Sequence, residues 1–537
     1  MSKPGELKKM NRHLIVKRPA AADRSLFASR QQGVGSRAIY VIDAADARSK
    51  LWLWIILWTT ALATRLLAAW LLPNAEQDGY SYAEMIARWS ASFSAGHFRL
   101  ADLFGFWLPL FPIVAAIPNT WIGNALLVGK ILTGLCGAVS CVLIFAITEK
   151  LTRSIVLAFV AFAIVLSSPL HVLYSAACMT DIPHACLVLA SLWCALQRRW
   201  MVASIFAAFA EGVRVEAWSL IILLPLIQFL YERRISLLSL AILLFPPLAW
   251  LCIGQLARGD PFAFFAERAR YQTQYLAFHG SDMHQDVDYF LLGANYIVFF
   301  SIMAAAGLWI WRALCRRRTP PLGDTIILGY TAVLLGFILF AYVTRRQPVL
   351  LPRYGLIFFV LGVPLLMCLI QSLLEQRRLS WFARSVAAAL IALCLWQGKK
   401  QLLTVSRVFA DFRAHQQVAQ ILAVTFQESP GLRQRCFSDD AAVRVLSGLP
   451  ADRFVRSATA ASAAHRNLTK FESYLREQNV AYLVFTRIED SLPVNFYPNL
   501  GGSRGSDTGN FQLITVGFSP FAPDVWLYRL RHREGAP

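Results

Sequence analysis

Charged residues of both signs recur in the short polar stretches that separate the apolar segments of this 537-residue chain. The stretch LLPNAEQDGYSYAEMIARW places Glu76 and Asp78 directly after the first apolar segment. Because charge in or near a membrane costs free energy, such residues are candidates for a functional site. The other candidates are Asp181 in MTDIPHA, Arg214 and Glu216 in EGVRVEAW, and Arg345, Arg346, Arg353 and Tyr354 in TRRQPVLLPRYG.

These residue types suit transfer of a group from a phosphate-linked donor. A carboxylate can take the proton of an acceptor hydroxyl or amine. Arginines bind phosphate and stabilise the charge that develops on it as a leaving group. Outer loops of membrane proteins carry few arginines, so three in one turn call for a ligand of opposite charge. The plainer interpretation, that outer loops simply need polar residues, stays open for each residue taken singly.

Another polar cluster, in FHGSDMHQDVDY, holds His279, Asp282, His284, Asp286 and Asp288. Imidazole and carboxylate groups are common metal ligands, but this spacing fits no standard metal site. We therefore predict no metal ligands and favour a polar loop that lines the acceptor entrance, with a divalent metal as the alternative. The chain has no Walker motif and no GxGxxG, so the sequence indicates no nucleotide site.

The elements that must position these residues are membrane helices. Hydrophobic residues make up 57% of the chain and charged residues 16%. Several apolar blocks reach the roughly 20 residues needed to span a bilayer core of about 30 Å, where only helices satisfy the backbone. We predict a polytopic α-helical membrane protein with about eleven transmembrane helices. The blocks include Leu51–Leu72, Leu126–Thr148, Ile155–Leu173, Leu237–Ile253, Tyr289–Ile310 and Thr325–Val343.

The net charge of +20 is explained by the orientation of the chain in the membrane rather than by nucleic-acid binding. Basic residues concentrate in the first fifty positions and in short turns, as the positive-inside rule requires of cytoplasmic loops. We predict a multi-pass protein of the inner (plasma) membrane, with a cytoplasmic N-terminus, an extracytoplasmic C-terminus and no nucleic-acid partner. The turns are at Arg198/Arg199, Arg233/Arg234, Arg316–Arg318 and Arg377/Arg378.

Three domains are expected. Residues 1–50 form a basic cytoplasmic tail that we predict to be disordered, and residues 51–398 form the transmembrane part. Within it, YAEMIARW is typical of an interfacial helix, and FWLPLFPIVAAIP of a re-entrant or interfacial segment. Residues 399–537 are predicted to form a small extracytoplasmic α/β domain. Its strand and helix signals are RCFSDDAAVRVLSG, KFESYLREQNVAYLVFT and DVWLYRLR.

The order of five short motifs resembles the C-type (GT-C) superfamily of polyprenyl-phosphate-dependent membrane glycosyltransferases. The nearest resemblance is to the bacterial branch with the lipid A aminoarabinose transferase and relatives of the protein O-mannosyltransferases. The motifs are QDGYSYAEMIA, WLPLFP, MTDIP, GVRVEAW and the late RYG. The resemblance implies an inverting glycosyltransferase, hexosyl or pentosyl in class. It would move a sugar from a polyprenyl-phosphate donor to a lipid, glycan or protein acceptor.

The resemblance also implies roles for residues. Asp78 holds the position of the first-loop base, and Asp181 that of the second-loop acid. Arg214 and Glu216 match the third element, and the arginines near Tyr354 would bind phosphate. Many relatives have an Asp-Glu pair, whereas here Gly79 follows Asp78 and Glu76 precedes it, which leaves the roles of Glu76 and Asp78 open. We expect the two carboxylates to point in different directions and the late arginines to be exposed.

The competing function is a multi-pass transporter or a lipid flippase. Transporters usually place charged groups near the bilayer midplane and are built from repeats with broken helices. This chain keeps its charges at one predicted face, shows no internal repeat and adds a polar C-terminal domain. These features favour the enzyme.

Overall fold

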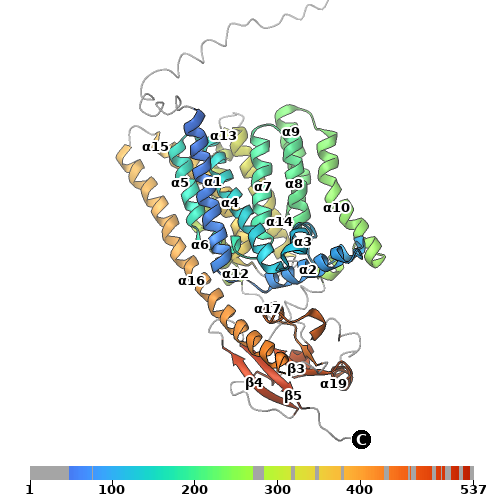
Figure 1. Ribbon diagram of the computed structural model, residues 1–537. Coiled ribbons are helices and arrows are strands. Elements are labelled where there is room, and N and C mark those ends of the chain that lie inside the picture. Colours follow the sequence, from blue (N-terminus) through green and yellow to red (C-terminus); the bar gives the residue numbers. More distant parts are fainter. Residues whose placement is uncertain are drawn as a thin grey trace, which may run out of the picture. The chain divides into compact units, whose positions relative to one another are not determined.

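The computed structural model describes residues 47–531, except 75, 270–282, 316–320, 345–349, 376–379, 429–433, 458–459, 461–466, 487–491, 498, 502–509 and 519–523. Helices dominate its first part and a small sheet its last part (Figure 1). The predicted N-terminal tail lies almost wholly outside the described residues. The fold class, a polytopic helical protein with a small C-terminal α/β region, is confirmed.

Eight described helices are long and apolar enough to cross a membrane, or nine spans if the bent pair α5–α6 counts as one. The chain is therefore a multi-pass membrane protein. The predicted count of about eleven would also need the shorter apolar helices α7 and α8 to cross, and it stays a prediction. The helices are α1 Ala47–Leu71, α2 Gln77–Ser94, α3 Leu110–Ile122, α4 Ala125–Thr152, α5 Ile155–Ser167, α6 Pro169–Ser175, α7 Asp181–Leu196, α8 Trp200–Val213, α9 Leu220–Glu232, α10 Leu237–Arg258, α12 Met283–Ala294, α13 Tyr296–Cys315, α14 Leu322–Val343, α15 Pro352–Leu374 and α16 Ser380–Gln427.

One predicted apolar block, Tyr289–Ile310, is not a single helix. The chain breaks between α12 and α13 at Asn295, which has a left-handed backbone with φ of 61°. Its side chain accepts from the Ile297 amide and donates to the Cys394 carbonyl of α16. Asparagine tolerates this conformation because its short polar side chain bonds locally. The break is invisible to hydropathy because both halves are apolar.

A second block, Ile155–Leu173, is bent by 62° at Ser168. Pro169 lacks an amide hydrogen and disfavours helical geometry in the residue before it, so α5 ends there and α6 starts anew. The buried Arg65 of α1 donates to the freed carbonyls of Val165 and Leu166, both at 3.0 Å. A buried arginine in a membrane helix thus satisfies the backbone that the proline releases.

The basic turns and the candidate site lie at opposite ends of the same helices. Arg198 and Arg199, between α7 and α8, line one pocket together with Arg234, which follows α9. Asp181 is the first residue of α7, and Arg214 directly follows the last residue of α8. A 16-residue helix such as α7 is about 24 Å long. The basic turn after α7 and the candidate site are thus separated by about the length of this helix.

The C-terminal region contains a five-stranded mixed sheet of order β2-β1-β3-β5-β4. β1 pairs in parallel with β2 and β3, while β5 pairs antiparallel with β3 and β4. The predicted strand–helix, helix–strand and closing-strand segments all occur. The elements are β1 Arg435–Phe437, α17 Ala441–Leu446, β2 Phe454–Val455, α19 Leu468–Glu477, β3 Val480–Phe485, α20 Leu492–Phe496, β4 Phe511–Gly517 and β5 Val525–Leu530.

Helix α16 joins the two parts of the chain. It continues without a break through Lys399, where the sequence places a domain boundary, and its C-terminal half packs on β4 and β5 (Figure 1). Ala414, Val418 and Leu422 of this half are buried in the core it shares with the sheet. The C-terminal sheet is thus built on the end of a helix that begins among the membrane helices.

Candidate active site

The first-loop carboxylates lie at the start of α2 rather than in an extended loop. Glu76 is the N-cap residue, with β backbone geometry, and Asp78 lies in the first turn. A carboxylate is favoured there because the helix N-terminus carries partial positive charge. The predicted interfacial helix is therefore longer than its sequence signal and includes the candidate base.

Asn74 fixes the segment between α1 and α2, which we call the first link. Its amide nitrogen donates to the Glu76 carbonyl at 2.9 Å, and its oxygen accepts from the Cys178 amide at 2.8 Å. The first link is thereby tied to the segment before Asp181. Nearby, the Lys130 ammonium donates to the Leu72 carbonyl at the end of α1. Together these bonds fix the position of the segment that carries Glu76 and Asp78.

Gly79 makes room for that amide. A Cβ at this position would lie 2.1 Å from the Asn74 amide nitrogen. This contact accounts for the Asp-Gly sequence, where the resemblance led us to expect an Asp-Glu pair. Because Asn74 makes two hydrogen bonds, its amide cannot move aside without breaking the tie to Cys178.

Gly79→Ala is therefore expected to lower activity by about 10–100-fold. Two hydrogen bonds of about 1 kcal/mol each are put at risk, and each 1.36 kcal/mol in the barrier is tenfold in rate. Turnover of the purified variant is the measurement. Gly336→Ala in α14 is the matched control, because nothing lies within 4 Å of its new Cβ. Equal activities of the two variants would contradict the expectation.

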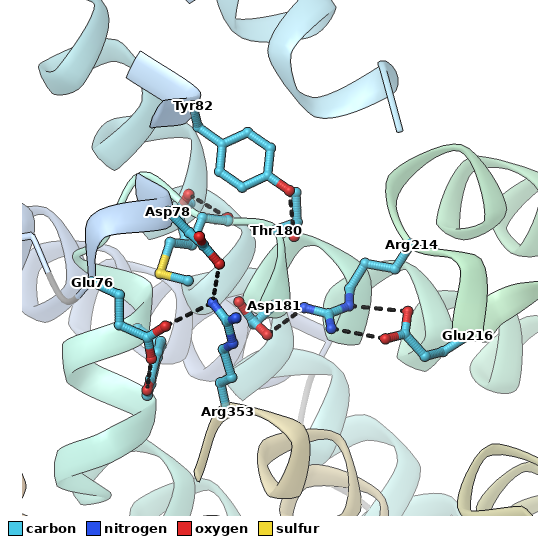
Figure 2. Close-up of polar contacts among 11 residues, drawn as sticks. Glu76, Asp78, Tyr82, Thr180, Asp181, Arg214, Glu216 and Arg353 are labelled. Atoms are coloured by element: carbon cyan, nitrogen blue, oxygen red, sulfur yellow. Dashed lines mark hydrogen bonds and ion pairs between the residues drawn. The ribbon is translucent and has the colours of Figure 1, made fainter. Parts of the chain in front are cut away.

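Arg353, at the start of α15, binds Glu76 and Asp78, which we call the first-link carboxylates. Its Nη1 lies 2.7 Å from Glu76 Oε2 and 2.8 Å from Asp78 Oδ2 (Figure 2). The prediction that the two carboxylates point in different directions is wrong, because both reach one guanidinium nitrogen. The expected exposure of this arginine is wrong too, since only 12% of its side chain is accessible.

Arg214 forms the second group of the site. It donates to Asp181 through Nη1 and to both oxygens of Glu216 through Nε and Nη2 (Figure 2). The paired bonds to Glu216 form the fork geometry that only arginine provides. Only 4% of the Asp181 side chain is accessible, and its Oδ2 is buried with no hydrogen-bond partner in the described part of the chain.

Tyr354 connects the two groups. The Arg214 and Arg353 guanidiniums lie 5.3 Å and 5.4 Å from the centre of its ring. Such cation–π contacts orient both arginines and replace part of their lost hydration. Arg214 lies between α8 and the 3-10 helix η4, Val215–Ser219. Residues from α2, α7, the α8–η4 junction and α15 thus meet in one charged cluster.

Tyr174 is a site residue that sequence reasoning missed. Its hydroxyl donates to Glu76 Oε1 at 2.6 Å, and α6 brings it there after the break at Ser168. Tyr82 was missed as well, and its hydroxyl lies 3.4 Å from that of Thr180. The only signal was the position of Tyr174 in YSAACMTD, shortly before Asp181. Aromatic residues are too common in this chain for that position to be informative.

Glu76 is a carboxylate of the site whose pKa is raised. Burial raises the pKa of its carboxyl, Arg353 opposes this, and the negative charge of Asp78 adds to the rise. The carboxyl therefore keeps its proton to a higher pH than a free glutamate. Four carboxylates share two guanidiniums here, so a proton on Glu76 relieves part of the excess negative charge.

Other predicted residues are elsewhere or outside the described residues. Four of them lie outside the described residues: Arg345, Arg346, His279 and Asp282. His284, Asp286 and Asp288 lie on α12, where Asp286 accepts from Tyr342 and Asp288 from Tyr296. Among the residues that the structure describes, no three His, Cys, Asp or Glu side chains are grouped to hold a metal ion.

Comparison with protein-family models finds no match, and comparison with curated protein sequences finds none either. Solved structures do match. ArnT from Cupriavidus metallidurans, bound to undecaprenyl phosphate, is similar over 90% of this chain and 98% of its own, with 14% identity and a TM-score of 0.55. The oligosaccharyltransferase AglB from Archaeoglobus fulgidus, with an inhibitory peptide and a dolichol-phosphate, is similar over 92% and 75%, with 10% identity and a TM-score of 0.51. The chain therefore has the same fold as these two structures, the GT-C fold.

Proposed function

We propose that the chain is a membrane glycosyltransferase that moves a sugar from a polyprenyl-phosphate donor to an acceptor at the outer face of the membrane. The observation that carries this proposal is the cluster of paired arginines and carboxylates at one end of α2, α7 and α15. It holds both groups that the reaction needs, a phosphate ligand and a proton acceptor. Both similar structures contain a polyprenyl-type phosphate, undecaprenyl or dolichol phosphate.

Arg353 is the proposed ligand of the donor phosphate. Nη1 serves Glu76 and Asp78, whereas Nε is buried and has no hydrogen-bond partner among the residues that the structure describes. A buried guanidinium N–H that lacks an acceptor is costly, and a phosphate oxygen would satisfy it. Arg214 is already occupied by Asp181 and Glu216, so we assign it the orientation of Asp181. Arg345 and Arg346, close in sequence, are further candidates for the phosphate.

Asp78 is the proposed base. Arg353 binds its Oδ2, and a third of the side chain is accessible, so an acceptor can reach it. The acceptor oxygen or nitrogen attacks the anomeric carbon while its proton passes to Asp78. The bond from that carbon to the phosphate oxygen breaks, and its electron pair leaves with the polyprenyl phosphate. Attack from the side opposite the leaving group inverts the anomeric centre.

Glu76 links the reaction to pH. Since its raised pKa keeps it protonated at moderately acidic pH, Arg353 then has one anionic partner fewer on the first link. If the ionised pair is the active form, the rate rises as pH rises through the pKa of Glu76. We expect the acid limb of the rate profile to lie above the usual range of a glutamate, and Glu76→Gln to remove that limb. An acid limb that is identical in Glu76→Gln and in the unmodified protein would exclude this role.

Transfer can be tested with the purified protein in lipid nanodiscs and labelled polyprenyl-phosphate sugars. Release of free polyprenyl phosphate that depends on the protein supports the proposal. The alternative, a transporter or flippase, predicts movement of the intact donor between leaflets without its cleavage. Charged groups near the midplane are typical of transporters. In the described ranges, the paired carboxylates and arginines instead gather where helices begin or end.

We further propose an inner-membrane location with the N-terminus inside and the C-terminus outside. Reporter fusions at the Arg198 and Arg233 turns are expected to read as cytoplasmic, and a fusion at Gln420 or later as extracytoplasmic. The physical reason is the positive-inside bias of the short turns. A cytoplasmic signal from the Gln420 fusion would place the sheet on the wrong side for this site.

A further inference from the structure

The C-terminal domain contacts α2 through Gln77, which lies between the two first-link carboxylates in sequence. The Gln77 amide nitrogen is 2.9 Å from Nε2 of His415 on α16 and donates to Asp440 at 3.3 Å. Its amide oxygen accepts from the Ala442 backbone amide at 3.1 Å. One side chain of the candidate site therefore reaches α16 and α17 at once.

The partners of Gln77 are themselves held in place. Asp440 is fully buried, lies 3.0 Å from His415 and caps α17 by accepting from the Val443 amide. Burial acts to raise the pKa of Asp440, but His415 and Val443 outweigh it and leave that pKa below the ordinary value. A buried ion pair of this kind keeps its geometry because separating it would leave an uncompensated charge.

Glu84 provides a second tether two turns further along α2. Arg444 of α17 donates to both of its carboxylate oxygens, and Arg456 lies 3.1 Å from one of them. Arg444 also donates to the Ser438 carbonyl at 2.8 Å, so it is fixed at its own end. The Glu84–Arg444 pair is largely buried, at 18% and 6% accessible, where ion pairs are screened little by salt.

The spacing of the tethers determines what they can do. Gln77 and Glu84 are seven residues apart, so at 3.6 residues per turn they lie on the same face of α2. Two anchors on one face of a helix prevent its rotation about the axis. Asp78 is the next residue after the first anchor, and its direction toward Arg353 depends on that rotation. Tyr80, on the same helix, packs against Ala441 and Ala442 of α17.

We propose that the C-terminal domain is a positioning element of the reaction, with Gln77 and Glu84 as its positioning residues. Together with His415, Asp440 and Arg444 they set the rotation of α2 and hence the aim of Asp78. This inference rests on the proposed transfer. A displacement of a catalytic group by about 1 Å can cost about 100-fold in rate, so small rotations of α2 matter.

The first test uses Gln77→Ala, Glu84→Ala and the double variant in the full-length protein. Each single variant is expected to lower kcat by about tenfold, and the double variant by about 100-fold. Binding of undecaprenyl phosphate is expected to be unchanged, because neither side chain contacts Arg353. Tyr497→Phe is the matched control: it removes a hydrogen bond to Glu472 within the same domain and leaves the α2 contacts intact. Glu84→Arg should be inactive, and adding Arg444→Glu should restore part of its activity.

A second measurement does not depend on activity. Hydrogen–deuterium exchange of residues 77–94 is expected to increase in the Gln77 and Glu84 variants and to stay unchanged in Tyr497→Phe. Exchange and kcat equal to those of the unmodified protein in both variants would overturn the proposal. So would a parallel loss of kcat, donor binding and thermal stability, which indicates a merely structural contact. If the unmodified protein releases no polyprenyl phosphate, the proposed transfer fails, while the exchange result still decides whether the domain holds α2.

Discussion

Asp78→Asn is expected to lower turnover by about 10²–10⁴-fold, the range that general-base catalysis contributes. The amide has nearly the shape of the carboxylate but cannot accept the acceptor's proton. It can still accept one hydrogen bond from Arg353, whose Nη1 lies 2.8 Å from Asp78 Oδ2 in the unmodified protein. Binding of undecaprenyl phosphate should therefore persist. Turnover with a labelled donor and equilibrium binding, measured on the same preparation, separate the two effects.

Two controls make this result specific. Asp102→Asn changes an exposed aspartate that caps the short helix η3, Leu100–Leu103, and should leave turnover near normal. Glu76→Gln is not an inert variant, because Glu76 shares Arg353 with Asp78. If Glu76→Gln abolishes transfer and Asp78→Asn does not, the base is Glu76. Full activity of both variants would show that the first-link acids are structural.

The sequence was informative where the signal is local. Apolar length predicts helices such as α4 and α14, because a bilayer imposes length and helicity on each segment separately. Short apolar runs predict β3 and β5 in the same way, and most residues of both strands are buried. The polar stretches that hold the candidate acids could also be predicted, since they interrupt apolar blocks, but the place of these acids at the starts of α2 and α7 could not. The break at Asn295 could not, because one residue in a left-handed conformation leaves the composition of the block unchanged.

The pairing within the site could not be predicted either. Asp78 and Arg353 are 275 positions apart, and only the packing of α15 and α2 among the other helices brings them together. The same holds for Gln77 and His415, which are 338 positions apart. Local charge patterns show which residues are expensive to bury but not which partner compensates them. The sequence therefore supported a charged outer site but gave the wrong orientation for Glu76 and the wrong exposure for Arg353.

The second large effect is expected at Arg353. Arg353→Ala should weaken binding of undecaprenyl phosphate by about 10²–10⁴-fold, because the Nε hydrogen bond to the phosphate, of about 1.5–3 kcal/mol, is lost together with the positive charge of the guanidinium. Arg353→Lys should restore only part of the affinity. A lysine ammonium is a single point charge, so it cannot serve Glu76 and Asp78 through one nitrogen while a second nitrogen binds the phosphate. Arg258→Ala, which removes an arginine with 60% of its side chain accessible, is the control with unchanged affinity.

Loss of folding must be separated from loss of binding, because Arg353→Ala leaves two neighbouring carboxylates without their shared cation. Removing one partner of a buried pair destabilises by about 3–5 kcal/mol, chiefly through the charge left behind. Adding Glu76→Gln removes one of these charges, so the double variant should recover thermal stability. Its affinity for undecaprenyl phosphate should stay low, because no donor for the phosphate has been restored. If affinity returns together with stability, Arg353 supports the fold of the first link and the phosphate binds elsewhere, with Arg214 the next residue to test.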